Sequence, residues 1–262
     1  MKVHVAGLSC GLDAVANRES AAGAMAVAAA AGSDLVVLPE YASRFDPGGV
    51  GPGDAEPLDG PFVASLREAA RSHGVAVIAG TTLPGRRRAV NAVVVIDGSG
   101  AVAGVYRKVH LFDAFGQRES ERLEPGPADA PPVVLEVAGM VVGVMTCYDL
   151  RFPESARRLV DAGAQVLAVP AAWASGDHKA DHWSTLLRAR AIENTAYVLG
   201  AAMQGPAVAG DALVVDPEGV ILAHARGGGQ AMAAAELRPE AVERARELNP
   251  VLRNRRYGVV PL

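Results

Sequence analysis

Three side chains of different reactivity each follow an apolar run in this sequence. Glu40 follows LVVLP, Lys108 follows VAGVYR, and Cys147 follows MVVGVMT. Ligands of α/β proteins bind outside the carboxyl ends of the strands. We therefore expect the carboxylate, the ammonium and the thiol to meet at one edge of a sheet.

The thiol of Cys147 stands at a position suited to a nucleophile. Its segment, MTCYDLRFPE, predicts a strand, a turn and then a helix from Pro153. This geometry exposes a nucleophile and directs backbone N–H groups toward it, so the N–H of Tyr148 is a candidate oxyanion donor. The competing interpretation is a buried cysteine that packs as a small apolar residue.

A free thiol has a pKa of about 8.5 and needs a base at neutral pH. None of the six histidines has an obvious place at a strand end, although His110 is close to Lys108. Glu40 is therefore the candidate base, and Lys108 is the candidate cation that balances its charge and binds an oxyanion. The alternative for Glu40 is an ordinary surface residue at the end of a strand.

Three blocks of the sequence resemble a known family. They are LVVLPEY at 35–41, YRKVHLFDAFG at 106–116 and MTCYDLRFPE at 145–154. These blocks closely resemble the catalytic blocks of the nitrilase-like carbon–nitrogen hydrolases, in the family's order. CYDLRFPE looks most like the amidase branch that includes omega-amidases and deaminated-glutathione amidases. Further matches extend over nearly the whole chain: Trp173 after an apolar run, RARAIENTAYV at 188–198 and DPEG at 216–219.

The resemblance implies a four-layer α-β-β-α sandwich and a role for each reactive residue. It implies Glu40 as general base, Lys108 as oxyanion stabiliser and Cys147 as nucleophile. It also implies a second glutamate shortly after the lysine block, and Glu119 in GQRES holds the matching place. Without the resemblance, Glu119 would be a solvated charge in a charged cluster. Glu121 and Glu124 are the alternatives to it.

The walls of the expected pocket are predicted less directly. Arg151 either pairs with a substrate carboxylate or binds Asp149 or Glu154 as a structural contact. Arg44 and Lys179 also follow strand-end blocks, where cations could bind an anion. Buried aromatic residues often belong to the core instead of a pocket. The candidate substrate-binding residues are Tyr41, Phe112, Tyr148, Arg151 and Trp173.

The elements that must position these residues alternate along the chain. Many of the expected strands are continuous β-branched runs, which indicates burial on both faces. Mixed with hairpin signals, this predicts an α/β fold of mixed sheets with helices outside, as one domain over residues 1–262. The expected strands are 2–8, 35–38, 76–79, 90–96, 102–106, 133–137, 140–146, 166–169, 197–203, 212–215, 220–225 and 231–236, the helices are 13–31, 61–73, 153–162, 183–194 and 239–247, and glycines 227–229 form a turn.

The composition excludes several classes of protein. Of the 262 residues, 50% are hydrophobic and 21% are charged, which is unlike a disordered chain. A net charge of −4 and 5% aromatic residues disfavour nucleic acid as a partner. Two distant cysteines form no disulfide framework. The first residues make a poor signal peptide and no apolar stretch is long enough for a membrane span, so we expect a cytoplasmic protein without membrane contact.

No metal or other cofactor is expected. His178 and His182 have the spacing of a zinc-binding pair, but no glutamate follows the first histidine. We predict a cofactor-free thiol hydrolase that cleaves a small carboxylate-bearing amide through a Cys147 thioester and releases ammonia. The alternatives are an N-carbamoyl-amine or nitrile hydrolase, or a catalytically silent binding protein with this fold. The resemblance implies a homodimer or larger homo-oligomer.

Overall fold

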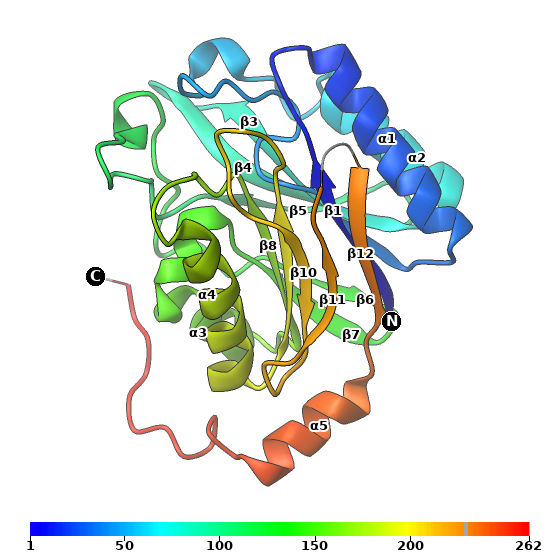
Figure 1. Cartoon of the computed structure of the whole chain (residues 1–262), viewed down its shortest axis with the longest axis vertical. Helices are drawn as coiled ribbons and strands as arrows, with labels where there is room; N and C mark the ends of the chain where they lie inside the picture. Colours follow the sequence, from blue (N-terminus) through cyan, green and yellow to red (C-terminus); the bar gives the residue numbers. More distant parts are fainter. Residues whose placement is uncertain (228–229, 262) are drawn as a thin grey trace.

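The computed structural model describes residues 1–227 and 230–261 of the chain. Within these residues the strands form two six-stranded mixed sheets, with helices packed against the outer face of each sheet (Figure 1). The α-β-β-α sandwich expected from the sequence is confirmed. The turn predicted at 227–229 extends outside the described residues. No described helix is both long and apolar enough to cross a bilayer.

The first sheet carries the N-terminal half of the chain. Its inner strands β1, β2 and β3 are parallel, while β12, β4 and β5 are antiparallel to their neighbours. Helices α1 (Ala14–Ala30) and α2 (Pro61–His73) pack on its outer face through buried alanines, Phe62 and Leu66. The strand order is β12 (Gln230–Glu236), β1 (Lys2–Leu8), β2 (Leu35–Val37), β3 (Ala76–Pro84), β4 (Ala89–Ile96) and β5 (Val102–Arg107).

The second sheet repeats this pattern. Its inner strands β7, β8 and β9 are parallel, and hairpin partners flank them. Helices α3 (Pro153–Asp161) and α4 (Lys179–Asn194) lie on its outer face, and α5 (Pro239–Leu248) lies beyond one end of the sandwich (Figure 1). The strand order is β11 (Ile221–Ala225), β10 (Ala212–Val215), β9 (Tyr197–Ala202), β8 (Val166–Ala171), β7 (Met140–Val144) and β6 (Val134–Val137).

The space between the sheets is filled by β-branched and other aliphatic side chains. Val5, Val37 and Val93 of the first sheet belong to the same buried cluster as Val142 and Leu199 of the second. Because the other face of each sheet is covered by helices, these strands are buried on both sides. This double burial explains their continuous apolar sequences.

Local signals set the helix boundaries as expected. The Asp13 carboxylate caps α1 by accepting hydrogen bonds from the N–H groups of Val15 and Ala16. Pro61 begins α2, and Gly74 ends it with a left-handed φ of 68°.

Two predicted boundaries are wrong in ways that matter for the site. β3 continues to Pro84 where the sequence suggested an end at Ala79, because Gly80-Thr81-Thr82 pair with β4 although they are not apolar. α4 begins at Lys179, before the predicted start at Trp183. The prediction missed the first turn because that turn is polar and lacks the apolar pattern of a helix. In both cases tertiary contacts outweigh the local pattern.

Candidate active site

Glu40, Lys108, Glu119 and Cys147 meet at one end of the sandwich. Glu40 follows β2 and Lys108 directly follows β5, both in the first sheet, whereas Cys147 follows β7 of the second sheet. The expected single sheet edge is therefore wrong. The residues meet across two stacked sheets, because the carboxyl ends of the inner parallel strands of both sheets point to the same end of the molecule.

The charged groups of this cluster are tightly paired. Lys108 Nζ lies 2.9 Å from Glu40 Oε1, and 2.9 and 3.1 Å from Glu119 Oε2 and Oε1. The exposed fractions of Glu40, Lys108 and Glu119 are 1%, 2% and 8%. One buried ammonium is thus shared by two buried carboxylates. Glu121 and Glu124, the alternatives to Glu119, lie outside this cluster: Glu121 is exposed, and Glu124 accepts from the backbone at 86–88.

Backbone N–H groups hold each carboxylate from a second side. Glu40 Oε2 accepts a hydrogen bond of 2.7 Å from the N–H of Ala172, which directly follows β8. Glu119 Oε2 accepts one of 2.5 Å from the N–H of Phe112, and the Tyr41 hydroxyl donates to Glu119 Oε1. These bonds fix the orientation of both carboxylates, which buried anions require.

The electrostatics favour charge on the lysine and on Glu119. Burial acts to lower the pKa of Lys108, but Glu119 and Glu40 outweigh it and raise that pKa well above its usual value. Burial acts to raise the pKa of Glu119, yet Lys108 and the bond from Tyr41 hold it below the usual range. Lys108 and Glu119 therefore form a charged pair at neutral pH.

Cys147 begins a short 3₁₀ helix, Cys147–Arg151, with a left-handed φ of 48°. A positive φ is uncommon for a residue other than glycine and aims this side chain away from the strand it follows. Burial and then Glu40 raise the pKa of the Cys147 thiol well above its usual value, while Lys108 opposes them. Cys147 and Glu40 line the same cavity, and the Glu40 carboxylate acts electrostatically on the thiol. In the resting site the sulfur therefore holds its proton, and a base stands next to it.

Asn91 is a site residue that the sequence analysis missed. It is fully buried in β4, and its Nδ2 lies 2.6 Å from Glu40 Oε1, 2.8 Å from Tyr41 Oη and 3.1 Å from Glu119 Oε1. The signal for it was present, because Asn91 interrupts the otherwise apolar strand AVNAVVVI. A polar side chain in a doubly buried strand needs partners there.

Asp149 is a second residue with a role that the sequence did not reveal. Its carboxylate accepts from the N–H of Thr146 at 3.0 Å and from the Tyr106 hydroxyl at 2.7 Å, and it lies 2.7 Å from Nδ1 of His110. Asp149 therefore connects the segment that follows β5, which carries Lys108, to the segment that follows β7, which carries Cys147. Arg151, for which Asp149 was a predicted partner, forms no ion pair among the described residues.

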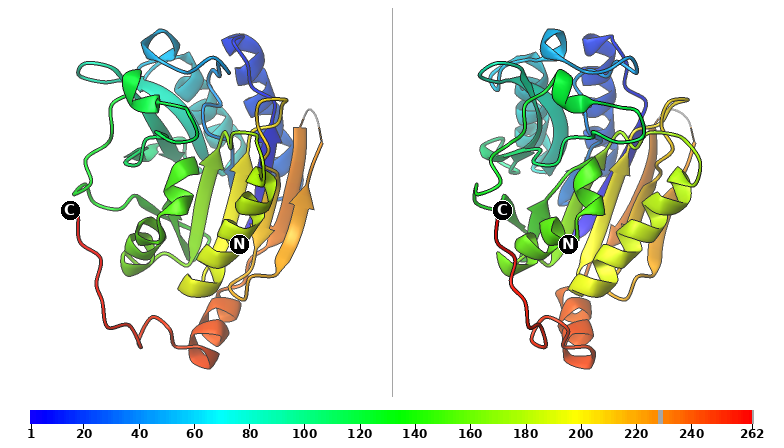
Figure 2. Two further views of the ribbon diagram at one scale, coloured as in Figure 1. Left: turned by 60° about the vertical axis from the view of Figure 1, so that its left-hand side comes forward. Right: turned by 90° about the vertical axis from the view of Figure 1, so that its left-hand side faces the viewer.

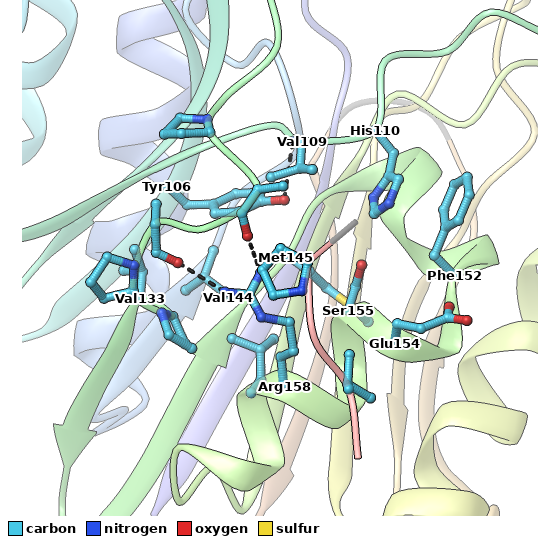
Figure 3. A pocket seen from close by; sticks show the side chains of 18 of the residues that line it. Tyr106, Val109, His110, Val133, Val144, Met145, Phe152, Glu154, Ser155 and Arg158 are labelled. Atoms are coloured by element: carbon cyan, nitrogen blue, oxygen red, sulfur yellow. Dashed lines mark hydrogen bonds between the residues drawn. The ribbon is translucent and has the colours of Figure 1, made fainter. Parts of the chain in front are cut away.

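A cavity of about 780 Å³ lies beside the contacts of Asp149, between β5, α3 and the C-terminal residues 258–261 (Figure 3). His110 and Tyr106 line it, and the His110 ring stacks on Phe152 with centroids 3.8 Å apart. The C-terminal chain runs from α5 along the outside of the sandwich to reach it (Figure 2). None of Glu40, Lys108, Glu119 and Cys147 lines this cavity, so it is separate from the candidate site.

A smaller cavity, of about 290 Å³, opens onto all four reactive residues. The predicted wall residues Tyr41, Phe112, Tyr148, Arg151 and Trp173 all line it. Tyr41 does more than form a wall, since its hydroxyl belongs to the carboxylate network.

Arg151, Lys179 and Arg122 line this cavity without a carboxylate partner among the described residues, and Arg122 Nε donates instead to the carbonyl oxygen of Val50 at 3.3 Å. The Arg151 guanidinium lies 4.9 Å from the centroid of the Trp173 ring, and its Nε is buried without a hydrogen-bond partner. Lys179 is 6% exposed, and its Nζ lies 3.3 Å from the Phe115 ring centroid. Burial and then Arg151 lower the pKa of Lys179. Arg44 differs, because it pairs with Asp54 at 2.8 Å.

The two histidines with zinc-like spacing lie near this cavity. Nδ1 of His182 is 3.4 Å from Arg151 Nη2. Within residues 1–227 and 230–261, no group of three or more His, Cys, Asp or Glu side chains is arranged to hold a metal ion.

The sequence and the fold match one family of hydrolases. The family model for carbon–nitrogen hydrolases matches residues 3–247, and the chain belongs to that family. The chain is 41% identical over 245 residues to the deaminated glutathione amidase of Escherichia coli O157:H7, covering 92% of each protein.

Solved structures agree with this assignment. A CN-hydrolase superfamily protein from Xanthomonas campestris, with an arsenic adduct in its active site, superposes with a TM-score of 0.88 at 27% identity, covering 100% of this chain and 99% of the other. A mutant of the amidase from Nesterenkonia sp. AN1 shows acrylamide added to its active-site cysteine. It superposes with a TM-score of 0.78 at 27% identity, covering 95% and 98% of the two chains.

Proposed function

We propose that this chain is an amidase that hydrolyses a small amide through a thioester on Cys147. The observation that carries the proposal is the buried thiol, which lines a cavity of about 290 Å³ together with Glu40 and Lys108. The names of the relatives support the amide as the bond that is cleaved. The adduct on the active-site cysteine of one of them supports a thiol nucleophile.

In the first half of the reaction the thiol attacks the amide. Sγ of Cys147 bonds to the carbonyl carbon while Glu40 takes the thiol proton. Because the resting thiol is protonated, this transfer accompanies the attack. The negative charge that forms on the carbonyl oxygen is stabilised by Lys108 and by the N–H of Tyr148. The C–N bond then breaks as Glu40 gives its proton to the nitrogen, and ammonia leaves.

In the second half water replaces the sulfur. Glu40, ionised again, takes a proton from a water molecule as its oxygen attacks the thioester carbon. The C–S bond breaks, the sulfur recovers the proton from Glu40, and the carboxylic acid leaves. Glu119 reacts with nothing in this scheme. It keeps Lys108 charged and in place through contacts of 2.9 and 3.1 Å.

The thiol is tested by exchanging each cysteine separately. Cys147→Ala should abolish ammonia release from small amides, and iodoacetamide should label Cys147 and stop turnover. Cys10→Ala is the matched control and should stay active. Burial raises the pKa of Cys10 to about 12, and no carboxylate is bonded to it among the described residues. Turnover retained in Cys147→Ala would refute the proposal, and failure of Cys147 to react with any electrophile would favour a silent binding protein.

The proposed substrate class follows from two cations of the cavity, Arg151 and Lys179, that have no acidic partner among the described residues. We propose an amide whose far end carries a carboxylate, held by Arg151 and Lys179 at the mouth of the cavity. Both side chains line the cavity, and neither has an acidic partner among the described residues. A carboxylate could pair with the buried Nε of Arg151 and with the ammonium of Lys179. Charge-assisted bonds of this kind discriminate strongly against neutral analogues.

The carboxylate is tested with an omega-amide acid and its methyl ester. The acid should have the higher kcat/KM, and Arg151→Met or Lys179→Met should remove most of the preference. Arg44→Met, whose parent arginine already pairs with Asp54, should keep it. Equal turnover of acid and ester by the wild type would contradict carboxylate recognition. An N-carbamoyl-amine or a nitrile hydrolysed far faster than either would replace the amide as substrate.

A further inference from the structure

Asn91 stands at the point where both carboxylates of the site converge. Its Nδ2 contacts Glu40 Oε1 and Glu119 Oε1, which are two of the three oxygens that Lys108 also contacts. Carboxylates accept hydrogen bonds and cannot donate them, so the amide must turn its NH₂ group toward them. Its backbone oxygen also accepts a bond of 2.9 Å from the N–H of Lys108. A single residue thus positions the lysine backbone and both acids.

The number of available donors shows why this amide matters. An ammonium has three N–H bonds, and Lys108 alone would have to neutralise two buried carboxylates with them. The NH₂ group of Asn91 adds two further donors at Glu40 and Glu119. The Tyr41 hydroxyl donates to Glu119 and also lies 2.8 Å from Nδ2 of Asn91, so the two N–H bonds of this amide are shared among three oxygens. All three N–H bonds of Lys108 contact carboxylate oxygens in this structure. Because Asn91 also donates to two of these oxygens, Lys108 can exchange one of its contacts for the oxygen of a substrate.

The other half of the same amide has no partner. Oδ1 of Asn91 is buried and accepts no hydrogen bond from the described residues. An unsatisfied buried acceptor destabilises the folded state. Such a group in a buried strand does not serve the fold, which points to a role at the carboxylates.

We infer that Asn91 is a positioning residue, which holds Glu40 and Glu119 around Lys108 so that the lysine can exchange one carboxylate contact for the substrate oxygen during the reaction. The inference rests on the proposed function of Glu40 as the base for Cys147. Asn91 touches neither the thiol nor the cavity, so it acts only through the groups that do.

Several charged groups face this network and set its pH response together. Glu40 and Tyr41 approach from the segment after β2, Lys108 from the end of β5, and Glu119 from its own short helix. Cys147 and Arg151 approach from the 3₁₀ helix, and Lys179 from α4. Asn91 is the neutral member that donates to both acids. Its loss should therefore make the pair of carboxylates take up a proton at a higher pH.

The test compares Asn91→Ala, Asn91→Ser and Asn91→Asp with Thr82→Val. Thr82 is the cross-strand partner of Asn91 in β3, is fully buried and also has an unpartnered side-chain oxygen. It forms no bond to the acids among the described residues, so Thr82→Val is a matched control. For each folded variant, kcat and KM are measured from pH 5 to 9, together with the rate at which iodoacetamide alkylates Cys147.

Asn91→Ala should lower kcat by on the order of 10²-fold with little change in KM, as a misplaced catalytic group does. The acidic limb of kcat and of the alkylation rate should move to higher pH, further in Asn91→Asp and less in Asn91→Ser, which keeps one donor. Thr82→Val should keep the wild-type profile. An unchanged acidic limb in the folded Asn91 variants, or the same shift in Thr82→Val, would overturn the inference. Alkylation reports on the network without turnover, so this outcome is distinct from failure of the proposed reaction.

Discussion

Lys108 is the residue on which the electrostatics of the site depend. Its ammonium is almost fully buried between Glu40 and Glu119. Breaking a buried ion pair by removing one member costs about 3–5 kcal/mol, because the remaining charge is left uncompensated. Lys108 is therefore both a structural cation and the proposed oxyanion donor, and its two roles must be measured separately.

Lys108→Met should lower kcat by at least 10²–10³-fold, the cost of losing an oxyanion donor. It should also lower the free energy of unfolding by about 3–5 kcal/mol at neutral pH. Urea unfolding and ammonia release measure the two effects, and Lys2→Met at the protein surface is the control. Borohydride trapping of a substrate on Lys108 would contradict the oxyanion role, because it would reveal a Schiff base.

Glu119 should make stability depend on acidity. Lys108 and the surrounding donors lower the pKa of Glu119 in the folded protein, whereas an unfolded glutamate has a pKa of about 4.3. The unfolded chain thus takes up a proton first as the pH falls, so the stabilisation from Glu119 is present above about pH 4.3 and is lost below it.

Glu119→Gln should accordingly be less stable than the wild type at pH 6, and the difference should shrink as the pH falls below about 4.3. Urea unfolding between pH 3 and 6 measures this difference. Glu121→Gln, at an exposed side chain, should follow the wild type at every pH. A difference for Glu119→Gln that grows toward acid pH would contradict the paired state of this carboxylate.

Among the strands, β3 lies directly against the backbone of Glu40, the proposed general base. A Cβ on Gly80 would lie 2.3 Å from the Cα of Glu40, so only glycine lets the segment after β2 rest directly on the strand. This close approach explains why β3 continues through Gly80 although the local sequence is not apolar. The position of Glu40 therefore depends on the absence of a side chain at Gly80 in β3.

Gly80→Ala should reduce both activity and stability, because the added methyl group meets backbone that cannot move aside easily. Overpacking of this kind costs about 1–3 kcal/mol, and displacement of Glu40 should lower kcat by about 10²-fold. Thermal unfolding and ammonia release measure the two effects. Gly53→Ala, where a Cβ would contact nothing within 4 Å, is the control. Full activity in Gly80→Ala would show that Glu40 tolerates displacement.

At the scale of the whole molecule, we predict a homodimer or larger assembly, as the family resemblance implied. The chain has a mass of 26.9 kDa. Light scattering at micromolar concentration should therefore give at least twice this mass. A particle of 26.9 kDa across the concentration range would contradict the prediction.

We also predict that no metal ion takes part in the reaction. A protonated thiol with an adjacent carboxylate base supplies the nucleophile and the proton transfers without one. Prolonged treatment with a chelator should leave ammonia release unchanged. Activity that is lost to the chelator and restored by zinc would instead indicate that His178 and His182 are ligands.

The class of fold could be predicted from the sequence, and three residues of the candidate site could be proposed from it. Continuous apolar strands such as LVVL require burial on both faces, and Asp13, Pro61 and Gly74 define helix ends through local backbone chemistry. These signals depend on residues that are close together in the sequence, so they can be recognised without a structure. Glu40, Lys108 and Cys147 could be picked out because each is a reactive side chain after an apolar run, and Glu119 only by family resemblance.

Only the tertiary structure decided how these residues meet. It brings together ends of strands from two stacked sheets, and nothing in the spacing of Glu40, Lys108 and Cys147 indicates that a second sheet is involved. It also shows that Asn91 and Asp149, which look like isolated polar residues in the sequence, each form several hydrogen bonds with residues of the site. The role of a buried charge or amide depends on the groups that form hydrogen bonds or ion pairs with it. Here those partners lie up to 132 positions away along the chain, as between Glu40 and the N–H of Ala172.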